Sequence, residues 1–350
     1  MNNQVMPILA IDVGAGTQDL LLYDEETPLE GSCKMILPSP TIIVANRINQ
    51  ASAFCRDIFL IGPTMGGGAC TSAVRSHLAA GLRVYATTSA AATINDNLEM
   101  VSEMGVIIQE EPPESTEVIH TCDIDIPALR NAFQLFDMTL PNDMAVAVQD
   151  HGYSPHKSNR MVRFEHFART IRAGGYLEAF AYREPPQAMT RMLAVSSYLE
   201  AHGLTSLLMD TGPAAIFGAS KDLRYEEPAL IINFGNSHTI ASILCDDCIT
   251  ALFEHHTSQL NPKRLRYFVD KFCLGKLENH EVFDDGGHGA HIECQPEGIM
   301  STLVTGPRRD LFLTSGAIKG AVAAAPGGDM MITGCMGLLE AWLKKDGLWR

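Results

Sequence analysis

The chain has 350 residues and a formal net charge of −15, because 26 lysines and arginines stand against 41 aspartates and glutamates. That length is enough for about two domains with cores of their own. The charge would repel phosphodiester backbones and anionic lipid headgroups, so nucleic-acid and membrane partners are not expected.

Short apolar strands alternate with longer helical segments, which is the pattern of an α/β protein. In the first 110 residues we predict strands at 5–13, 20–23, 41–45, 59–61, 82–86 and 106–109, and helices at 74–80 and 95–104. Two prolines make 110–117 a loop. Beyond it we predict a helix after Pro127, a strand at 144–149, a turn at 150–155, a helix at 188–202, a strand at 207–209 and a short helix at 213–219.

An acidic loop at Pro228 marks the expected domain boundary, which gives a first domain over 1–227 and a second over 228–350. We expect the last helix, after Gly334, to pack back toward the first domain. The N-terminal segment has no basic residue before Lys34, so it lacks the positive flank of a secretory signal, and we expect a cytoplasmic protein. The nine cysteines are scattered, and no second CxxC accompanies Cys245 and Cys248, so we expect reduced thiols.

A repeated hairpin is the most informative feature of the sequence. Residues 9–17, LAIDVGAGT, are echoed by residues 230–239, LIINFGNSHT, with a polar residue, a spacer and a glycine in matching places. Two facing glycine turns can offer backbone N–H groups to a phosphate from both sides, because glycine lets the chain approach closely. Asp12, in the first copy, is expected to hold magnesium, usually through water.

With these hairpins the sequence resembles the actin, sugar kinase and heat-shock ATPase superfamily, whose two domains clamp ATP between them. Four motifs match in the family's order: 12–19 the first phosphate loop, 210–216 the first connecting helix, 233–239 the second phosphate loop and 332–338 the adenosine motif. The resemblance implies two ribonuclease H-like domains with mixed sheets around a cleft that holds ATP and magnesium. The nucleotide-binding residues it implies are Asp12, Gly14, Gly16, Thr17, Gln18, Asn233, Gly235, Asn236, Ser237, His238, Thr239, Gly334, Cys335 and Met336.

Three further segments, 62–68, 150–152 and 305–309, are similar to an uncharacterised prokaryotic family that carries the label pyruvate formate-lyase activating enzyme. That label implies radical chemistry on an iron–sulfur cluster, which needs a CxxxCxxC triplet of thiolate ligands. The sequence has no such spacing.

Two aspartates are the candidate catalytic residues. Asp210 precedes a predicted helix N-terminus, and the resemblance to sugar kinases implies that it takes a proton from a substrate hydroxyl; the alternative is a plain helix cap. Asp150, with His151, ends a strand at the edge where open sheets place their ligands, so it either orients water or substrate or shapes the turn.

Two further segments leave alternatives open. In the acidic loop 284–291, His288 and His291 either hold a metal or belong to a solvated turn. The adjacent His255 and His256 diverge, so a shared metal is not expected there. The triple glycine at 66–68 either lines the cleft near the phosphates or permits tight packing.

Three functional classes compete for the expected ATP site. Asp210 favours a phosphotransferase or ATPase that acts on a small-molecule substrate, although the second domain leaves little material for a substrate subdomain. The alternative is an ATP-gated regulatory or activator protein for a partner enzyme. A filament-forming actin homologue is disfavoured, because the net charge opposes self-association.

Overall fold

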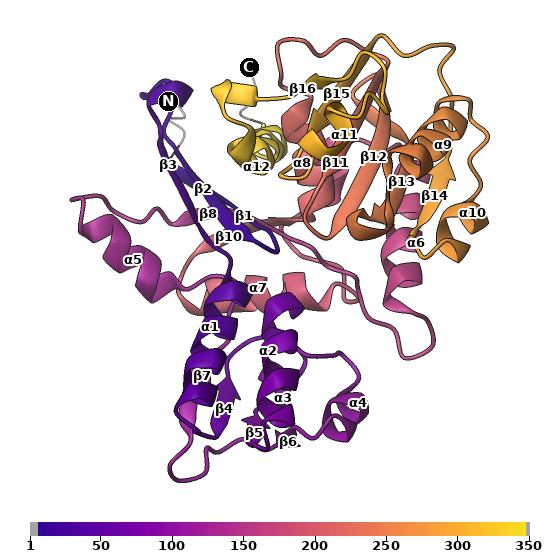
Figure 1. Cartoon of the computed structure of the whole chain (residues 1–350). Coiled ribbons are helices and arrows are strands. Elements are labelled where there is room, and N and C mark those ends of the chain that lie inside the picture. Colours follow the sequence, from indigo (N-terminus) through magenta and orange to yellow (C-terminus); the bar gives the residue numbers. More distant parts are fainter. Residues whose placement is uncertain (1–5, 348–350) are drawn as a thin grey trace.

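The computed structural model describes residues 6–347, and two of its sheets have six strands each. The first sheet has the order β3-β2-β1-β8-β10-β9. Its strands are β1 Ile8–Val13, β2 Thr17–Tyr23, β3 Cys33–Pro38, β8 Asp143–Val148, β9 Ala181–Tyr182 and β10 Thr205–Met209. Strand β1 is antiparallel to β2 and parallel to β8. We call this sheet with its helices the first lobe (Figure 1).

The second six-stranded sheet repeats this arrangement, with the order β14-β13-β12-β11-β15-β16. Its strands are β11 Ala229–Phe234, β12 His238–Cys245, β13 Cys248–His256, β14 Gly289–Ile292, β15 Ser301–Thr305 and β16 Val322–Ala323. Strand β11 is antiparallel to β12 and parallel to β15. In both lobes, therefore, the first two strands form a hairpin, and a later strand, β8 or β15, runs parallel to the first on its other side. This repeated topology is the expected pair of ribonuclease H-like domains of an actin-like ATPase fold.

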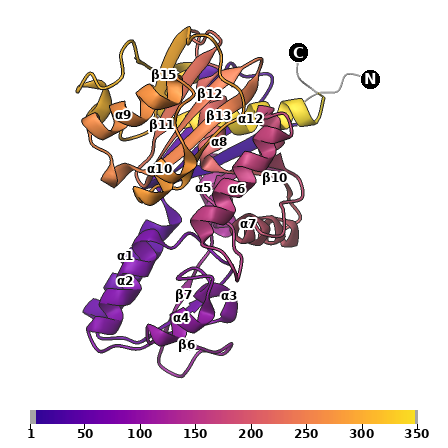
Figure 2. The same cartoon turned by 90° about the vertical axis from the view of Figure 1, so that its right-hand side faces the viewer.

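A smaller unit, residues 40–120, is inserted between β3 and β8, and we call it the insertion subdomain (Figures 1 and 2). Its parallel sheet has the order β6-β5-β4-β7. The strands are β4 Ile58–Ile61, β5 Val84–Ala86, β6 Ile107–Ile108 and β7 Glu117–His120, and the helices are α1 Pro40–Ala53, α2 Gly68–Ala79, α3 Thr88–Ala91 and α4 Leu98–Glu103. The subdomain has an apolar core of its own.

The remaining helices complete the lobes. They are α5 Ile126–Gln134, α6 Asn159–Arg172, α7 Thr190–Ala201 and α8 Thr211–Ala219, followed by α9 Pro262–Cys273, α10 Asn279–Asp284, α11 Asp310–Leu313 and α12 Thr333–Lys345. Helix α12 packs against α8 and against β1 and β8 of the first lobe, which confirms the expected return of the last helix. The division at Pro228 stays a prediction.

Helices α8 and α12 meet almost backbone to backbone. A Cβ atom at Gly218 would overlap the carbonyl oxygen of Thr333, and one at Gly337 would overlap that of Ala214. Only glycine permits this approach, so these two positions set the distance between the helices.

The structure corrects the prediction at 41–45, which is helix and not strand. The β-branched run from Thr41 to Val44 suggests a strand locally. However, Pro40 occupies the first helical turn, and the residues that α1 buries recur at helical spacing: Thr41, Val44, Ala45, Ile48 and Ala51. Tertiary packing thus overrides the local preference.

Elements that were not predicted include β3, β7 and α6 before Pro228, and β13, β14, β15, α9 and α10 after it. Val5, in the predicted first strand, lies outside the described residues. All nine cysteines are free thiols. Within residues 6–347, no helix combines the length and apolar character needed to cross a membrane.

Candidate functional site

A cavity of about 610 Å³ lies between the two lobes and reaches the insertion subdomain. It opens at the carboxyl ends of parallel strands, where open α/β sheets bind ligands. Asp12 lies near the end of β1, Asp150 follows β8, and Thr305 ends β15. The fold alone therefore gathers polar groups from both lobes in one place.

The two predicted phosphate loops face each other across this cavity. Each is closed by the same bond: the N–H of Gly14 donates to the Thr17 carbonyl at 2.9 Å, and that of Gly235 donates to the His238 carbonyl at 2.9 Å. A Cβ atom at Gly16 would lie 2.9 Å from Nδ2 of Asn236, so the loops touch. The predicted loop residues that line the cavity are Asp12, Gly14, Thr17, Asn233, Gly235, Asn236, Ser237 and His238.

Other predicted binding residues lie beside the cavity and do not line it. The amide of Gln18 donates to the Pro38 carbonyl at 3.0 Å, and the hydroxyl of Thr239 bonds to that of Thr257 at 3.0 Å. Gly16 supports the contact between the loops and is also absent from the lining.

The predicted adenosine motif forms the first turn of α12. Gly334 reaches the cavity and packs directly against the Asp12 carboxylate. Cys335 and Met336 are buried in the core that α12 shares with α8, and the Cys335 thiol donates to the Asp19 carbonyl at 3.0 Å. The structure therefore does not bring these two side chains to the cavity.

Asp12 carries a buried carboxylate whose Oδ1 has no hydrogen-bond partner. Burial, with the nearby charges of Asp19 and Asp210, raises its pKa well above the usual range. Burial also raises the pKa of Asp19, its partner across the β1–β2 hairpin, to about 6. Two carboxylates that repel each other at a cavity wall favour a cation, and hard oxygen ligands suit Mg²⁺. The donor set at Asp12 therefore fits the magnesium ion that the resemblance implies.

Asp210 caps α8 and is saturated with hydrogen bonds. Its Oδ1 accepts from the Gly212 N–H at 2.9 Å and from Nη2 of Arg163 at 2.9 Å. Its Oδ2 accepts from the Asp150 N–H at 3.0 Å and from Nη1 of Arg163. The cap is thus present in the structure, whereas the role of proton acceptor stays a prediction.

Arg163, on α6, is the main residue that the sequence analysis missed. Its guanidinium is buried and forks between Asp210 of the first lobe and Glu254 of the second, donating to Glu254 through Nε at 2.8 Å and Nη2 at 3.0 Å. Burial opposes ionisation of Glu254, but the guanidinium holds the pKa of that carboxyl below its usual value. The segment 159–172 alternates charged and apolar residues, and nothing local distinguishes this arginine from its exposed neighbours.

Asp150 is also engaged by the backbone. Its carboxylate accepts from the Gly152 N–H at 2.8 Å and from the Met192 N–H at 2.9 Å, so it fixes the turn after β8 against α7. Burial raises its pKa to about 6. The turn role is seen directly, and a catalytic role stays a prediction.

The glycines at 66–68 line the cavity and also permit close packing, while a place near bound phosphates stays a prediction. All three line the cavity. A Cβ at Gly66 would also lie 2.7 Å from Cζ of Arg191, whose guanidinium pairs with Asp123 at 2.7 Å and donates to the Gln149 carbonyl at 2.8 Å. Close packing thus fixes the insertion subdomain against the turn that follows β8.

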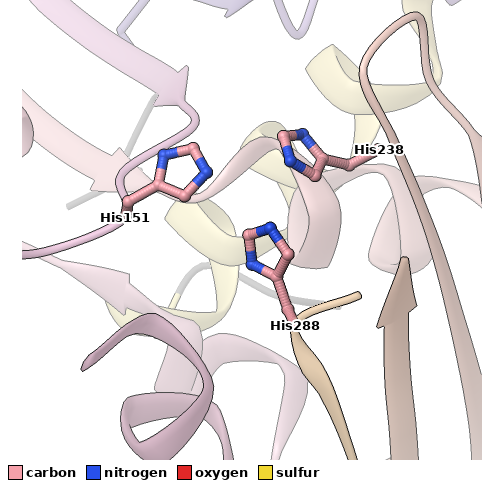
Figure 3. A group of neighbouring side chains, drawn as sticks. All are labelled: His151, His238 and His288. Carbon is pink, nitrogen blue, oxygen red and sulfur yellow. The ribbon is translucent and has the colours of Figure 1, made fainter. Parts of the chain in front are cut away.

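His288 and His291 do not come together. His291 lies 3.1 Å from a Glu293 oxygen, and His255 pairs with Asp285. His288 instead lies beside His151 and His238 (Figure 3). Burial lowers the pKa of His238 to about 4. Burial and nearby positive charge lower the pKa of His151 to about 3 and lower the pKa of His288 as well. These shifts favour the neutral form of all three imidazoles.

Comparison with known proteins gives one family match. Residues 65–311, more than half of the chain, match the family described as "Putative pyruvate format-lyase activating enzyme (DUF1786)". No curated protein matches the chain.

Several solved structures are similar. One is a protein of actin-like ATPase fold and unknown function from Bacteroides thetaiotaomicron, with 7% identity, 95% of this chain and 96% of that chain covered, and a TM-score of 0.37. A "putative N-acetylmannosamine kinase" from Listeria monocytogenes has 9% identity, 97% and 100% coverage, and a TM-score of 0.36. The activator of 2-hydroxyisocaproyl-CoA dehydratase from Clostridium difficile, with bound ADPNP, has 8% identity, 99% coverage of both chains, and a TM-score of 0.30. These scores are too low to support an argument, so the fold assignment stands on the strand order.

Proposed function

Since the chain belongs to the DUF1786 family and has an actin-like ATPase fold, we propose that it binds ATP with magnesium in the cleft and transfers the terminal phosphoryl group to water or to a small molecule. The observation that carries this proposal is the pair of facing hairpin loops. In each loop a glycine N–H, that of Gly14 or Gly235, donates to the carbonyl three residues further on. Both loops line one cavity, together with Asp12.

The loops would hold the phosphates through their backbone. Residues 14, 15 and 17 of the first loop and 235–238 of the second line the cavity, so their N–H groups can face a triphosphate from two sides. Asp12 and Asp19 would hold the hydrated magnesium ion, which supplies positive charge against the phosphate oxygens. Because carboxylates are in excess at this wall, we expect free ATP without a cation to bind poorly.

The insertion subdomain supports a small-molecule acceptor. It forms a third wall of the cavity through Gly66, Arg75 and Thr93, which lie away from both phosphate loops in the sequence. The cavity volume of about 610 Å³ falls within the range of small-molecule sites. The insertion subdomain thus offers material for substrate recognition, and the shortness of the second domain is no obstacle.

The alternative, an ATP-gated activator of a partner enzyme, is favoured by a different observation. Asp210 and Asp150 accept hydrogen bonds from backbone N–H groups, and Asp210 also from the Arg163 guanidinium, so their carboxylate oxygens are already engaged within the protein. A carboxylate used in this way is a weak general base. An activator needs closure of the lobes around ATP but no such base.

Two measurements test the proposal. Calorimetry with ATP, in magnesium and in EDTA, should show binding that depends on magnesium and that falls at least about tenfold in Asp12→Asn, the loss of one ion contact. Asp270→Asn, an exposed aspartate on α9, is the matched control and should bind as the wild type does. Absence of binding at millimolar ATP would overturn the proposal.

The second measurement separates the two functions. Terminally labelled ATP is incubated with wild type, or with Asp12→Asn, in an extract of small metabolites. Label that enters a metabolite only with wild type supports a phosphotransferase. Slow release of free phosphate without any labelled metabolite would show transfer to water only, which excludes a small-molecule acceptor in the extract and favours the activator.

A further inference from the structure

Three histidines from distant parts of the chain lie together, and two of them, His151 and His238, line the cavity (Figure 3). His151 follows β8 in the first lobe, whereas His238 begins β12 and His288 precedes β14 in the second. One nitrogen of each ring lies within 4.8 Å of the others. The ring centroids are 5.3 Å apart for His151 and His238, 5.3 Å for His151 and His288, and 4.8 Å for His238 and His288.

This spacing is close to that of a metal site. Bonds of about 2.0–2.1 Å in a tetrahedral complex place ligand nitrogens roughly 3.4 Å apart. The three ring nitrogens lie within 4.8 Å of one another, and rotation of the imidazole rings would bring them to the shorter distance. All three ligands are of one kind, neutral nitrogen, which suits zinc and neighbouring divalent metals better than magnesium.

Buried nitrogens without partners point independently to a ligand. Nε2 of His238 and Nε2 of His288 are buried and make no hydrogen bond. Such groups are rare in folded proteins, because each gives up its bond to water without replacement. A metal ion among the three rings would give these nitrogens a partner.

The surrounding residues could orient the rings as supporting groups do in metal proteins. Oε2 of Glu254 lies 3.3 Å from Nδ1 of His288, and the side chain of Gln149 bonds to Nδ1 of His238. In both rings the Nδ1 atom therefore faces a polar partner, and Nε2 is left for the centre of the cluster. Carboxylate and amide partners of this kind fix the ring and its tautomer in metal sites.

We propose that His151, His238 and His288 bind a divalent transition metal of the zinc class, with a fourth coordination position open to the cavity. The open position follows from the lining: His151 and His238 face the cavity, while His288 lies behind them. Three protein ligands and one open position is the arrangement of catalytic rather than structural zinc. The site does not depend on the proposed nucleotide binding.

The experiment uses the full chain, stripped with a chelator and without nucleotide. Calorimetric titration with ZnCl₂ should show one ion per chain. His238→Gln and His288→Gln should each weaken binding by more than the roughly 10–100-fold that loss of a supporting residue costs. His291→Gln, whose partner is Glu293, is the matched control and should bind zinc as the wild type does.

Cobalt substitution identifies the ligands in the wild-type protein alone, so the test stands even if a variant fails to fold. Absorption bands of tetrahedral Co²⁺ with nitrogen ligands are expected. A sulfur-to-cobalt charge-transfer band would assign the ion to the free cysteines and overturn the proposal. Absence of stoichiometric zinc in the wild type, or an equal loss in His291→Gln, would overturn it as well.

Discussion

Replacing Arg163 by methionine should destabilise the protein more than any exposed ion pair could. The guanidinium donates five hydrogen bonds, to both oxygens of Asp210, both oxygens of Glu254 and the Asp150 carbonyl. The side chains of all three charged residues are at most 5% exposed. Methionine fills a similar volume but leaves two carboxylates buried without a counter-charge.

The expected cost is about 3–5 kcal/mol, the usual value when one partner of a buried pair is removed. Lys157→Met is the matched control, because Lys157 pairs with Glu165 on the surface, where the two side chains are 46% and 45% exposed. It should cost less than about 1 kcal/mol. Removing both charges of the pair between the lobes, in Arg163→Met with Glu254→Met, should recover part of the loss.

Urea unfolding of the four proteins at pH 7, followed by fluorescence, gives the free energies directly. The reasoning would be refuted if Arg163→Met and Lys157→Met cost the same. It would also be refuted if the double variant were less stable than Arg163→Met, because the cost would then come from lost packing rather than from stranded charge.

Three other predictions concern the helix crossing and the buried aspartates. Gly337→Ala should lower the free energy of unfolding by about 1–3 kcal/mol, because its Cβ would overlap the carbonyl of Ala214. Gly298→Ala, the control, has open space around it and should change the free energy of unfolding by less than about 0.5 kcal/mol. Equal effects of the two substitutions would contradict the packing argument. Folding raises the pKa of Asp150 to about 6, so the unfolded chain binds fewer protons and the stability of the protein falls as pH rises from about 4 to 6. This loss, about 3 kcal/mol, should be absent in Asp150→Asn when urea unfolding is compared at pH 4 and 7.5. The same pH dependence in the variant and the wild type would disprove the prediction. Asp12→Asn should unfold at a higher temperature than wild type in EDTA, because it removes a carboxylate that burial and two neighbouring charges destabilise. A lower unfolding temperature would count against this.

The hairpin repeat could be predicted because its determinants are local. Strand, polar residue and glycine turn occupy nine consecutive residues in the first copy and ten in the second, and the register that closes the turn follows from them. The meeting of the two copies in one cleft followed from the resemblance, which supplied the order of motifs. In contrast, the strand predicted at 41–45 rested on local preference alone, and burial along one helix face decided otherwise.

The groups that the sequence did not reveal depend on long-range pairing. Arg163 acquires its role only when α6 lies beside β13 of the other lobe. The three imidazoles belong to three separate elements, and His288 was considered with His291 because the two are neighbours in the chain. However, His288 precedes β14 and lies near Glu254, whereas His291 lies within β14 and pairs with Glu293, so the two side chains meet different surroundings. Sequence spacing predicts ligand sets within one loop but not across two lobes.

The return of α12 to the first lobe has a mechanical consequence. The chain crosses to the second lobe between Ala219 and Ala229, and it crosses back between Ala323 and Thr333. A body tethered at two neighbouring points retains one easy rotation, about the line that joins them, while twisting and sliding strain both tethers. We therefore expect the cleft to open by a hinge motion with a single degree of freedom. One pair of fluorophores across the mouth of the cleft would follow its whole course.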